Sequence, residues 1–368
     1  MEKMMLAAAK TKAAPGIELI TVPVPKLTDE EVLVKVKASG LCGSDVEFYK
    51  GHARPDSPAF VPGHEPMGIV EEVGENAAKR WGVKPGDRVA LEVIIPCRTC
   101  FECLTGNYQA CRNRQGGHGV TPVDVAPSLW GGFAEYMYLA PGSVVHKIDN
   151  TLPVEVAAMY NSMGAGVRWA LHYGQVQFGD TVLVLGSGLR GIAAVIAAKA
   201  AGAGRVVVTG LEADAHKLAL AREFGADHTV VVDGDAAEDV VERVRDLTDG
   251  RGVDVTLELT PMAAGPVTDA LLATKHGGRV VLAGIKGDRE IPVRTDLIIN
   301  RALTVQGAFG VDARAMAEAI ALIESRRFPL ERMHTHTFGL DDTAHAIEVL
   351  AGEVPGESAV HVSVHPNL

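Results

Sequence analysis

The sequence predicts an α/β protein with two domains, one built on a parallel, doubly wound sheet and one rich in short strands. At about 150 residues per domain, a chain of 368 residues corresponds to two domains or three. After residue 155, apolar runs such as TVLVLG (181–186) alternate four times with helical patterns, as parallel strands and crossover helices do. Before that point, the segments are short, valine-rich and bounded by turn residues, which indicates a partly open β-barrel.

The strands of the parallel sheet are predicted from runs of apolar residues, because a strand buried on both faces carries few polar residues. These runs lie at 181–186, 205–210, 228–232, 253–259 and 279–284, with helices expected at 192–202, 214–224, 236–248 and 264–275. The β-rich part contains EEVLVKVKASG, MGIVEEVG and GDRVALEV. From about residue 300 follow ALTVQGAFG, a helix near 312–326 and a final HVSVHP strand.

Charge and hydropathy exclude several classes of protein. Lysine and arginine number 35 against 46 aspartate and glutamate residues, a net charge of −11, and no basic run exceeds two residues, so nucleic acid is not an expected partner. The longest apolar stretch, 181–203, is interrupted by Arg190, Lys199 and glycines, which favours a buried strand and helix over a membrane span. The N-terminus has no secretory pattern, so we expect a cytoplasmic protein.

Four of the five cysteines lie in one short segment with the spacing C-x2-C-x2-C-x7-C. Clustered cysteines in a cytosolic chain indicate metal ligands rather than disulfides. Four thiolates close a tetrahedron around Zn²⁺ and leave no position for substrate, so the predicted site is structural. An iron–sulfur cluster is the rival interpretation. The four residues are Cys97, Cys100, Cys103 and Cys111.

A second candidate metal site combines Cys42 in GLCGSD with His64 and Glu65 in PGHEPMG. Cysteine, histidine and glutamate are all zinc ligands, and a catalytic zinc takes three protein ligands with one open position. The glycine and proline residues beside His64 predict a tight turn that exposes it. On these residues alone, ordinary core and surface roles remain the alternative.

A dinucleotide-binding loop is predicted where Gly186, Gly188 and Gly191 form G-x-G-x-x-G between an apolar strand and an alanine-rich helix. The first glycine makes the turn, the second admits the pyrophosphate to the backbone, and the third lets the helix pack closely. Leu189 and Arg190 complete the loop. A merely tight turn is the alternative.

An acidic residue about 20 positions later would hold the ribose hydroxyls of NAD. The strand RVVVTG ends in Gly210, which carries no carboxylate, and Glu212 follows two residues later, then Asp214. A carboxylate there would repel the 2′-phosphate of NADP, and the nearest basic residue is Lys217. The sequence therefore predicts NAD rather than NADP, with Glu212 as the ribose ligand or, alternatively, as a solvated loop residue.

Together these motifs resemble the zinc-dependent medium-chain alcohol dehydrogenases over nearly the whole chain, with KPGDRV, GGFAEY and HVSVHP as further similarities. The resemblance implies a GroES-like catalytic domain (1–157 and 300–368, with a structural zinc lobe at about 95–113) interrupted by a Rossmann nicotinamide-binding domain (158–299). It implies two zinc ions per chain, one catalytic and one structural. Asp45 would orient the ligand histidine, and Ser44 would carry the alcohol proton away from the metal.

The chain departs from the family pattern at two positions. The resemblance places the third catalytic ligand, usually Cys, Asp or Glu, at Asn161, and an amide is a poor zinc ligand. Because Cys42 thiolate and Glu65 carboxylate together neutralise Zn²⁺, we predict a Cys42–His64–Glu65 site with Asn161 nearby as a hydrogen-bonding group.

The second departure is Glu47, where many members of the family carry a histidine as the outer station of the proton relay. Three alternatives stay open. Glu47 accepts the proton, His52 takes over this role, or the relay is missing.

The leading hypothesis is NAD-linked oxidation of a secondary or cyclic alcohol, or of a polyol. The alternative is 1,4-reduction of a conjugated C=C bond, and the third is a non-enzymatic zinc-binding module. The resemblance also implies a homodimer or homotetramer, and the sequence does not choose. Tyr49, Phe60, Trp130 and Met163 are candidates for an apolar substrate pocket or for core packing.

Overall fold

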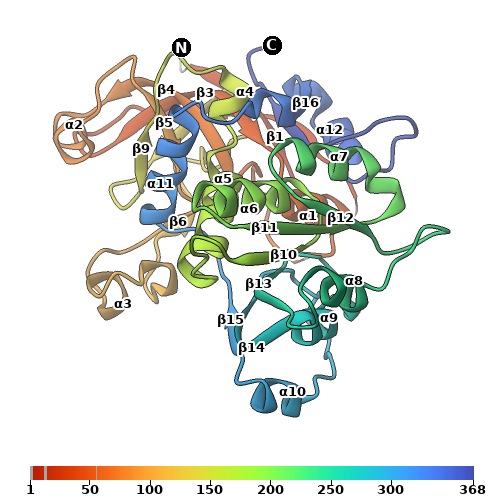
Figure 1. Ribbon diagram of the computed structural model, residues 1–368. Coiled ribbons are helices and arrows are strands. Elements are labelled where there is room, and N and C mark those ends of the chain that lie inside the picture. The colour runs from red at the N-terminus through yellow and green to blue at the C-terminus, as the bar shows by residue number, and fades with distance from the viewer. Residues whose placement is uncertain (1–2, 12–14, 55) are drawn as a thin grey trace. The chain divides into compact units, whose positions relative to one another are not determined.

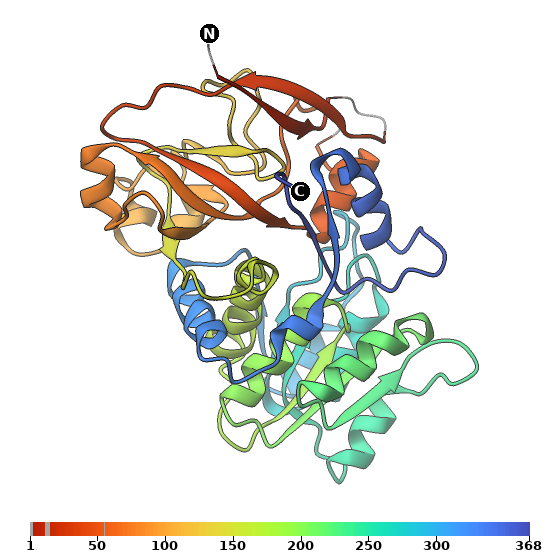
Figure 2. The same cartoon turned by 90° about the horizontal axis from the view of Figure 1, so that it is seen from above.

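The computed structural model describes residues 3–11, 15–54 and 56–368. The chain divides into two compact units, Met1–Asn161 with Ile320–Leu368, and Ser162–Ala319. Figure 1 traces the elements in chain order, and Figure 2 shows that red and orange N-terminal strands share the first unit with the blue C-terminal segment. The fold is mixed α/β, with one unit rich in short strands and one built on a parallel, doubly wound sheet, as the sequence predicts.

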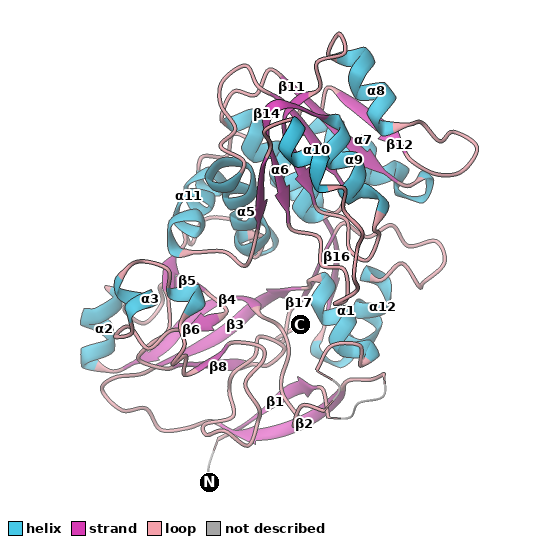
Figure 3. Cartoon of the chain, turned by 90° about the horizontal axis from the view of Figure 1, so that it is seen from below, coloured by secondary structure: helices cyan, strands magenta, loops and turns pink. Residues whose placement is uncertain are grey.

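The first unit is built on a sheet with the strand order β16-β17-β3-β4-β5-β9, in which β8 also pairs with β3. Two smaller sheets, β1-β2 and β6-β7, accompany it, and the β1-β2 pair is set off from the larger sheet in Figure 3. Its strands are β1 (Met4–Ala9), β2 (Glu18–Pro23), β3 (Val32–Gly40), β4 (Glu65–Val73), β5 (Arg88–Leu91), β6 (Ile94–Ile95), β7 (Gly116–Gly117), β8 (Tyr136–Leu139), β9 (Val145–Lys147), β16 (His334–Phe338) and β17 (His361–Val364).

Short helices fill the connections of the first unit. The segment α1 follows β3 directly and packs on α12. These helices are α1 (Gly43–Lys50), α2 (Glu75–Trp81), α3 (Phe101–Leu104), η1 (Tyr108–Ala110), α4 (Val154–Ala157), η4 (Leu330–Met333), η5 (Leu340–Asp342) and α12 (Thr343–Leu350), while α5 (Tyr160–Val167) and α11 (Ala313–Glu324) run across the boundaries between the units.

The second unit contains a six-stranded parallel sheet with the order β12-β11-β10-β13-β14-β15. The chain moves outward from β10 to β12 and then returns to build β13 to β15. Because parallel crossovers are right-handed, this reversal puts α6 and α7 on one face and α8 and α9 on the other. The elements are η2 (Arg168–Tyr173), β10 (Thr181–Leu185), α6 (Leu189–Ala200), β11 (Arg205–Gly210), η3 (Glu212–Asp214), α7 (Ala215–Glu223), β12 (His228–Val231), α8 (Val240–Leu247), β13 (Val253–Glu258), α9 (Gly265–Ala273), β14 (Thr274–Leu282), α10 (Thr295–Asn300) and β15 (Thr304–Gly307).

Several boundaries differ from the sequence prediction, including the first change of unit, which lies after Asn161 rather than after residue 157. The sequence places the return to the first unit at residue 300, whereas contacts place it at Ile320, because β15 pairs with β14 and completes the parallel sheet. The strand predicted at 279–284 begins earlier, at Thr274, since the polar start of β14 continues the pairing with β13. The apolar stretch 181–203 forms β10 and α6. Among the described residues, no helix is long and apolar enough to cross a membrane.

Tyr160 ties together two strands that flank the candidate site of the first unit. It is fully buried, and its hydroxyl donates to the carbonyl oxygens of Pro66, at 3.0 Å, and Leu91, at 2.7 Å. Each carbonyl belongs to the end of one strand, β4 or β5.

We expect Tyr160→Phe to lower the free energy of unfolding by about 1–3 kcal/mol, because two buried carbonyls lose their shared donor. Urea denaturation measures this change. The control is Tyr136→Phe, whose hydroxyl accepts from the exposed Lys3 and whose loss should cost less than about 1 kcal/mol. Equal losses in the two variants would contradict the role of Tyr160.

Candidate functional site

Cys42, His64 and Glu65 come together in the first unit, and we name them the three-ligand cluster. The thiol sulfur, an imidazole nitrogen and a carboxylate oxygen all lie within 4.8 Å of one another. The cluster forms because β3 ends at Gly40, which pairs with Glu65 at the start of β4. Cys42 follows β3 as the N-terminal cap of α1, and His64 immediately precedes β4.

Asp45 orients the imidazole of His64. Its Oδ2 accepts a hydrogen bond from the Cys42 backbone N–H at 2.9 Å, and its Oδ1 lies 3.5 Å from His64 Nδ1. Burial alone would lower the pKa of His64, but the Asp45 carboxylate and the Cys42 sulfur together raise this pKa well above its usual value. With Nδ1 turned toward Asp45, Nε2 is the nitrogen that faces Cys42 and Ser44.

The three-ligand cluster fits a zinc ion. A thiolate, an imidazole and a carboxylate are zinc ligands, and ligand atoms about 2.0–2.3 Å from one ion lie about 3.3–3.8 Å apart, so a small contraction completes the site. Two negative ligands match the ionic charge. Among the residues that the structure describes, the buried atoms His64 Nδ1 and Asp45 Oδ1 form no hydrogen bond, and a cation on Nε2 would strengthen the interaction between them.

The other residues predicted for this site lie at different depths. Ser44 Oγ is 3.3 Å from His64 Nε2, beside the cluster. Glu47 Oε2 lies 3.2 Å from His52 Nδ1, and the two side chains are 31% and 65% exposed. The structure thus pairs the two relay candidates with each other at the surface of α1. Asn161 is buried at the start of α5, next to Tyr160, whose pKa is raised by burial and by Glu65.

The four residues suggested for a substrate pocket take mostly structural positions. Phe60 and Trp130 are buried in the first unit, and Met163 is fully buried in the second. Tyr49 donates its hydroxyl to Glu348 at 2.8 Å. Burial of the first three favours the core-packing alternative.

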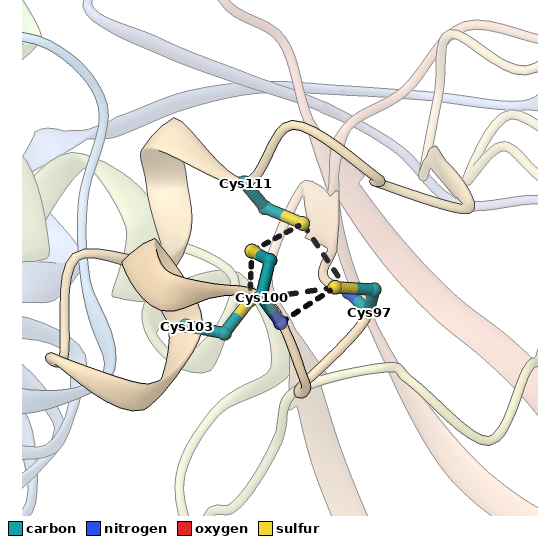
Figure 4. A group of neighbouring side chains, drawn as sticks. All are labelled: Cys97, Cys100, Cys103 and Cys111. Carbon is teal, nitrogen blue, oxygen red and sulfur yellow. Dashed lines mark hydrogen bonds between the residues drawn. The ribbon is translucent and has the colours of Figure 1, made fainter.

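The four clustered cysteines form one compact lobe, shown in Figure 4. Their sulfur atoms are 3.5–3.9 Å apart in three of the pairs, and all four lie within 4.8 Å of one another. Four sulfurs at about 2.3 Å from a zinc ion would lie about 3.8 Å apart, so the lobe fits a tetrahedral ion. Backbone N–H groups of Cys97 and Cys100 each point at a sulfur 3.4 Å away. The pKa of Cys97 falls to about 6, chiefly through the Thr99 backbone N–H, which favours a thiolate.

A buried carboxylate anchors this lobe. Glu92 is 2% exposed, accepts a hydrogen bond from the Tyr108 hydroxyl in η1, and lies 2.8 Å from His146 Nε2 on β9. Tyr108 precedes the last cysteine of the lobe by three residues. The loop that carries the cysteines is therefore fixed to the core at a point close to its end.

The glycine loop in the second unit has the geometry of a pyrophosphate site. Gly186 has φ of 112°, which a residue with a side chain rarely adopts, and Gly188 caps the N-terminus of α6. No atom lies within 4 Å of a Cβ added to Gly188, so its backbone is open to approach. A Cβ on Gly191 would overlap the carbonyl oxygen of Gly186, which is why the helix can start this close to the turn. Leu189 and Arg190 form its first turn, and Arg190 lies over the Trp169 ring.

Negative charge gathers at the carboxyl end of β11. A Cβ at Gly210 would lie 2.6 Å from Ser187 Oγ, so a larger residue at this position would require the Ser187 side chain to move. Glu212 begins η3 just beyond, exposed, and its backbone N–H donates to Asp233 at 2.7 Å. Asp214 holds Lys217 in an ion pair of 2.7 Å, which neutralises the nearest cation.

Two buried groups near these sites were not singled out from the sequence. Glu258, at the end of β13, is fully buried and pairs with Lys286 at 2.9 Å, next to the turn at Gly186. His361 on β17 is fully buried beside Glu65. The sequence signal for Glu258 was a carboxylate at the end of an apolar strand, in VDVTLEL. The signal for His361 was the histidine that begins HVSVHP.

The comparisons with known proteins agree with this geometry. Residues 28–150 match the alcohol dehydrogenase GroES-like domain, and residues 191–325 match the zinc-binding dehydrogenase domain. A probable alcohol dehydrogenase of Mycobacterium tuberculosis is 41% identical over 347 residues, 93% of each chain. The erythritol/L-threitol dehydrogenase of Mycolicibacterium smegmatis is 33% identical over 357 residues, 94% of this chain and 93% of that protein.

A solved structure described as a zinc-binding dehydrogenase of Sinorhizobium meliloti 1021, bound to NADP, has a TM-score of 0.84 and 28% identity, covering 99% of this chain and all of that one. The chain belongs to the zinc-dependent medium-chain dehydrogenases, the family of the zinc-containing alcohol dehydrogenases. It is therefore an oxidoreductase of the zinc-containing dehydrogenase type, a class that works with a nicotinamide cofactor. This excludes a non-enzymatic zinc module and does not favour C=C reduction.

We expect Gly191→Ala to lower the free energy of unfolding of the second unit by about 1–3 kcal/mol, because the added methyl group overlaps backbone. Gly188→Ala, where the methyl group meets no atom, should leave stability within about 0.5 kcal/mol of the parent. Thermal unfolding of both variants makes the comparison. If Gly188→Ala were as unstable as Gly191→Ala, the inference that Gly188 is open and Gly191 is closely packed would be wrong.

Proposed function

We propose that this protein interconverts a secondary or cyclic alcohol, or a polyol, and its ketone, with NAD as the hydride acceptor. The convergence of Cys42, His64 and Glu65 carries this proposal, because the set matches the ligands and charge of a catalytic zinc. The erythritol/L-threitol dehydrogenase among its relatives supports the polyol class.

The residues of the first unit have distinct parts in this proposal. Cys42, His64 and Glu65 would hold the ion, which when bound polarises the substrate oxygen and lowers the pKa of the alcohol. Asp45 keeps His64 in the tautomer that presents Nε2. The hydroxyl of Ser44 would accept the proton of the alcohol while it passes its own proton on, and the Glu47–His52 pair at the surface would be the acceptor that releases a proton to solvent.

In the second unit, the open backbone of Gly188 and the N-terminus of α6 would receive the pyrophosphate. Glu212 would accept hydrogen bonds from the adenosine ribose, and the carboxylate of Asp233, which accepts from the Glu212 backbone N–H, adds negative charge that repels a 2′-phosphate. These groups support NAD over NADP.

The protein is further proposed to be a cytoplasmic homodimer or homotetramer. The cysteines at both sites form no disulfide, which favours a reducing compartment. All four residues of β15, the last strand of the sheet, are exposed, and Ile299 and Phe309 beside it are 70% and 67% exposed. An exposed edge strand with apolar neighbours is suited to pair with a second copy.

We expect elemental analysis to find two zinc ions per chain. Cys111→Ser should lose the ion of the lobe and retain one ion per chain. Cys42→Ser should lose the ion of the three-ligand cluster and also retain one. Glu65→Gln should weaken the second site, because a charged ligand is replaced by an amide. One ion in the unmodified protein, or full retention in Glu65→Gln, would count against the proposed ligand set.

The cofactor assignment is tested by kinetics. We expect a higher kcat/KM with NAD(H) than with NADP(H). Glu212→Ala should lower kcat/KM for NAD at least tenfold, since a hydrogen bond to a charged group contributes about 1.5–3 kcal/mol. Glu242→Ala, which removes an exposed carboxylate from α8, is the control and should change neither value. Preference for NADP(H) in the parent protein would overturn the assignment.

A further inference from the structure

A row of polar side chains crosses the large sheet of the first unit and ends at Glu65. Gly40 on β3 pairs with Glu65 on β4 and with Ser363 on β17. Cross-strand partners share a face, and so do residues two apart on one strand, so Glu65, Ser363 and His361 all point to the face on which Gly40 has no side chain. His361 in turn pairs with His334 on β16.

The missing side chain of Gly40 leaves room that two functional groups fill. A Cβ on Gly40 would lie 3.2 Å from Glu65 Oε2 and 3.3 Å from His361 Nε2. The carboxylate and the imidazole therefore approach the same point from opposite neighbours of β3. Any larger residue at this position would push them apart.

His361 is held from its other side. It is fully buried, and its Nδ1 lies 3.0 Å from Nδ1 of His334. His334 Nε2 is 2.7 Å from the hydroxyl oxygen of Thr337, near the surface. His361 Nε2 has no hydrogen-bond partner among the described residues, although it is buried and is directed at the point next to Glu65.

The contact between the two Nδ1 atoms allows one proton between them, and its position decides what His361 presents to Glu65. If His334 donates, His361 carries its proton on Nε2 and offers an N–H to the carboxylate. If His361 donates, its bare Nε2 faces the carboxylate, and two electron-rich groups meet in a buried space. The first arrangement is favoured, because a buried carboxylate needs donors. It also lets the Thr337 hydroxyl donate to His334.

We propose that His361, set in its tautomer by His334, is a positioning residue that holds the Glu65 carboxylate at the metal centre. The donor reaches the carboxylate directly or through one bridging water. This inference rests on the proposed role of Glu65 as a ligand. Partners of metal ligands typically change metal affinity by about 10–100-fold, which is the size of effect expected here.

The test is a double-mutant cycle read out by zinc affinity, measured by chelator competition on the full-length protein. With two zinc sites, the competition curve has two phases of zinc release. The phase that disappears in Cys42→Ser belongs to the three-ligand cluster, and the remaining phase, from the cysteine lobe, serves as an internal control. His361→Leu should raise the dissociation constant of the cluster phase about 10–100-fold and leave the lobe phase unchanged. In a Glu65→Gln background, the same change should cost less than about threefold.

Two further variants separate positioning from general disruption of β17. His361→Gln keeps an N–H donor and should restore affinity to within about threefold of the parent. Ser363→Ala alters an equally buried residue on the same strand, whose hydroxyl contacts His365, and should have no effect on zinc. If Ser363→Ala weakened zinc as much as His361→Leu, or if the Gln variant gave no recovery, the proposal would be wrong.

Nitrogen-15 spectra of the parent protein give a readout that needs no variant to fold. We expect His361 to carry its proton on Nε2 and His334 on Nδ1, and the opposite pattern would overturn the proposal. The two hypotheses also fail differently. If Glu65→Gln retains full zinc affinity, the ligand set itself is wrong. If Glu65→Gln loses zinc but His361→Leu does not, only the positioning role is wrong.

Discussion

The metal centre of the first unit depends on the antiparallel pairing of β3 with β4. Cys42 and His64 are 22 residues apart in the chain, yet the last pair of this ladder, Gly40 with Glu65, sets them on adjacent strand ends. Three donors of different chemistry then meet at one point, because each lies within two residues of that pair. The two strands pair from Val32 opposite Val73 to Gly40 opposite Glu65, so the ligands lie at the end of a long ladder that holds their backbone in place.

Burial makes the electrostatics of this frame demanding. Asp45 and Glu65 are each 1% exposed, and an uncompensated carboxylate at that depth is costly. Asp45 uses one oxygen on the Cys42 backbone and the other toward His64, so it both builds the N-terminus of α1 and orients a ligand. The Asp45 carboxylate and the Cys42 sulfur both favour the charged form of the ring, which explains why the pKa of His64 is raised despite its burial. The same ring, neutral, would be a ligand.

Sequence patterns predicted most of this arrangement, because they report on local physics. The parallel strands appear as apolar runs since both their faces are buried, and G-x-G-x-x-G specifies a turn whose glycines are each required by backbone geometry. The spacing of Cys97 to Cys111 likewise encodes a lobe. What the sequence did not reveal is set by pairing between distant segments. The polar start of β14 and the exposed β15 carry no apolar pattern, so the boundary was expected near 300 rather than at Ile320. The row from Glu65 to His334 joins residues nearly 270 positions apart through register alone.

The shared space beside Gly40 has a consequence for how this family can diverge. Gly40, Glu65 and His361 lie on three neighbouring strands and share one small volume. A substitution at any one of these positions therefore changes which residues fit at the other two. Across related sequences, the residues that correspond to Gly40, Glu65 and His361 should therefore change as a set, while His334 follows only where its partner is histidine.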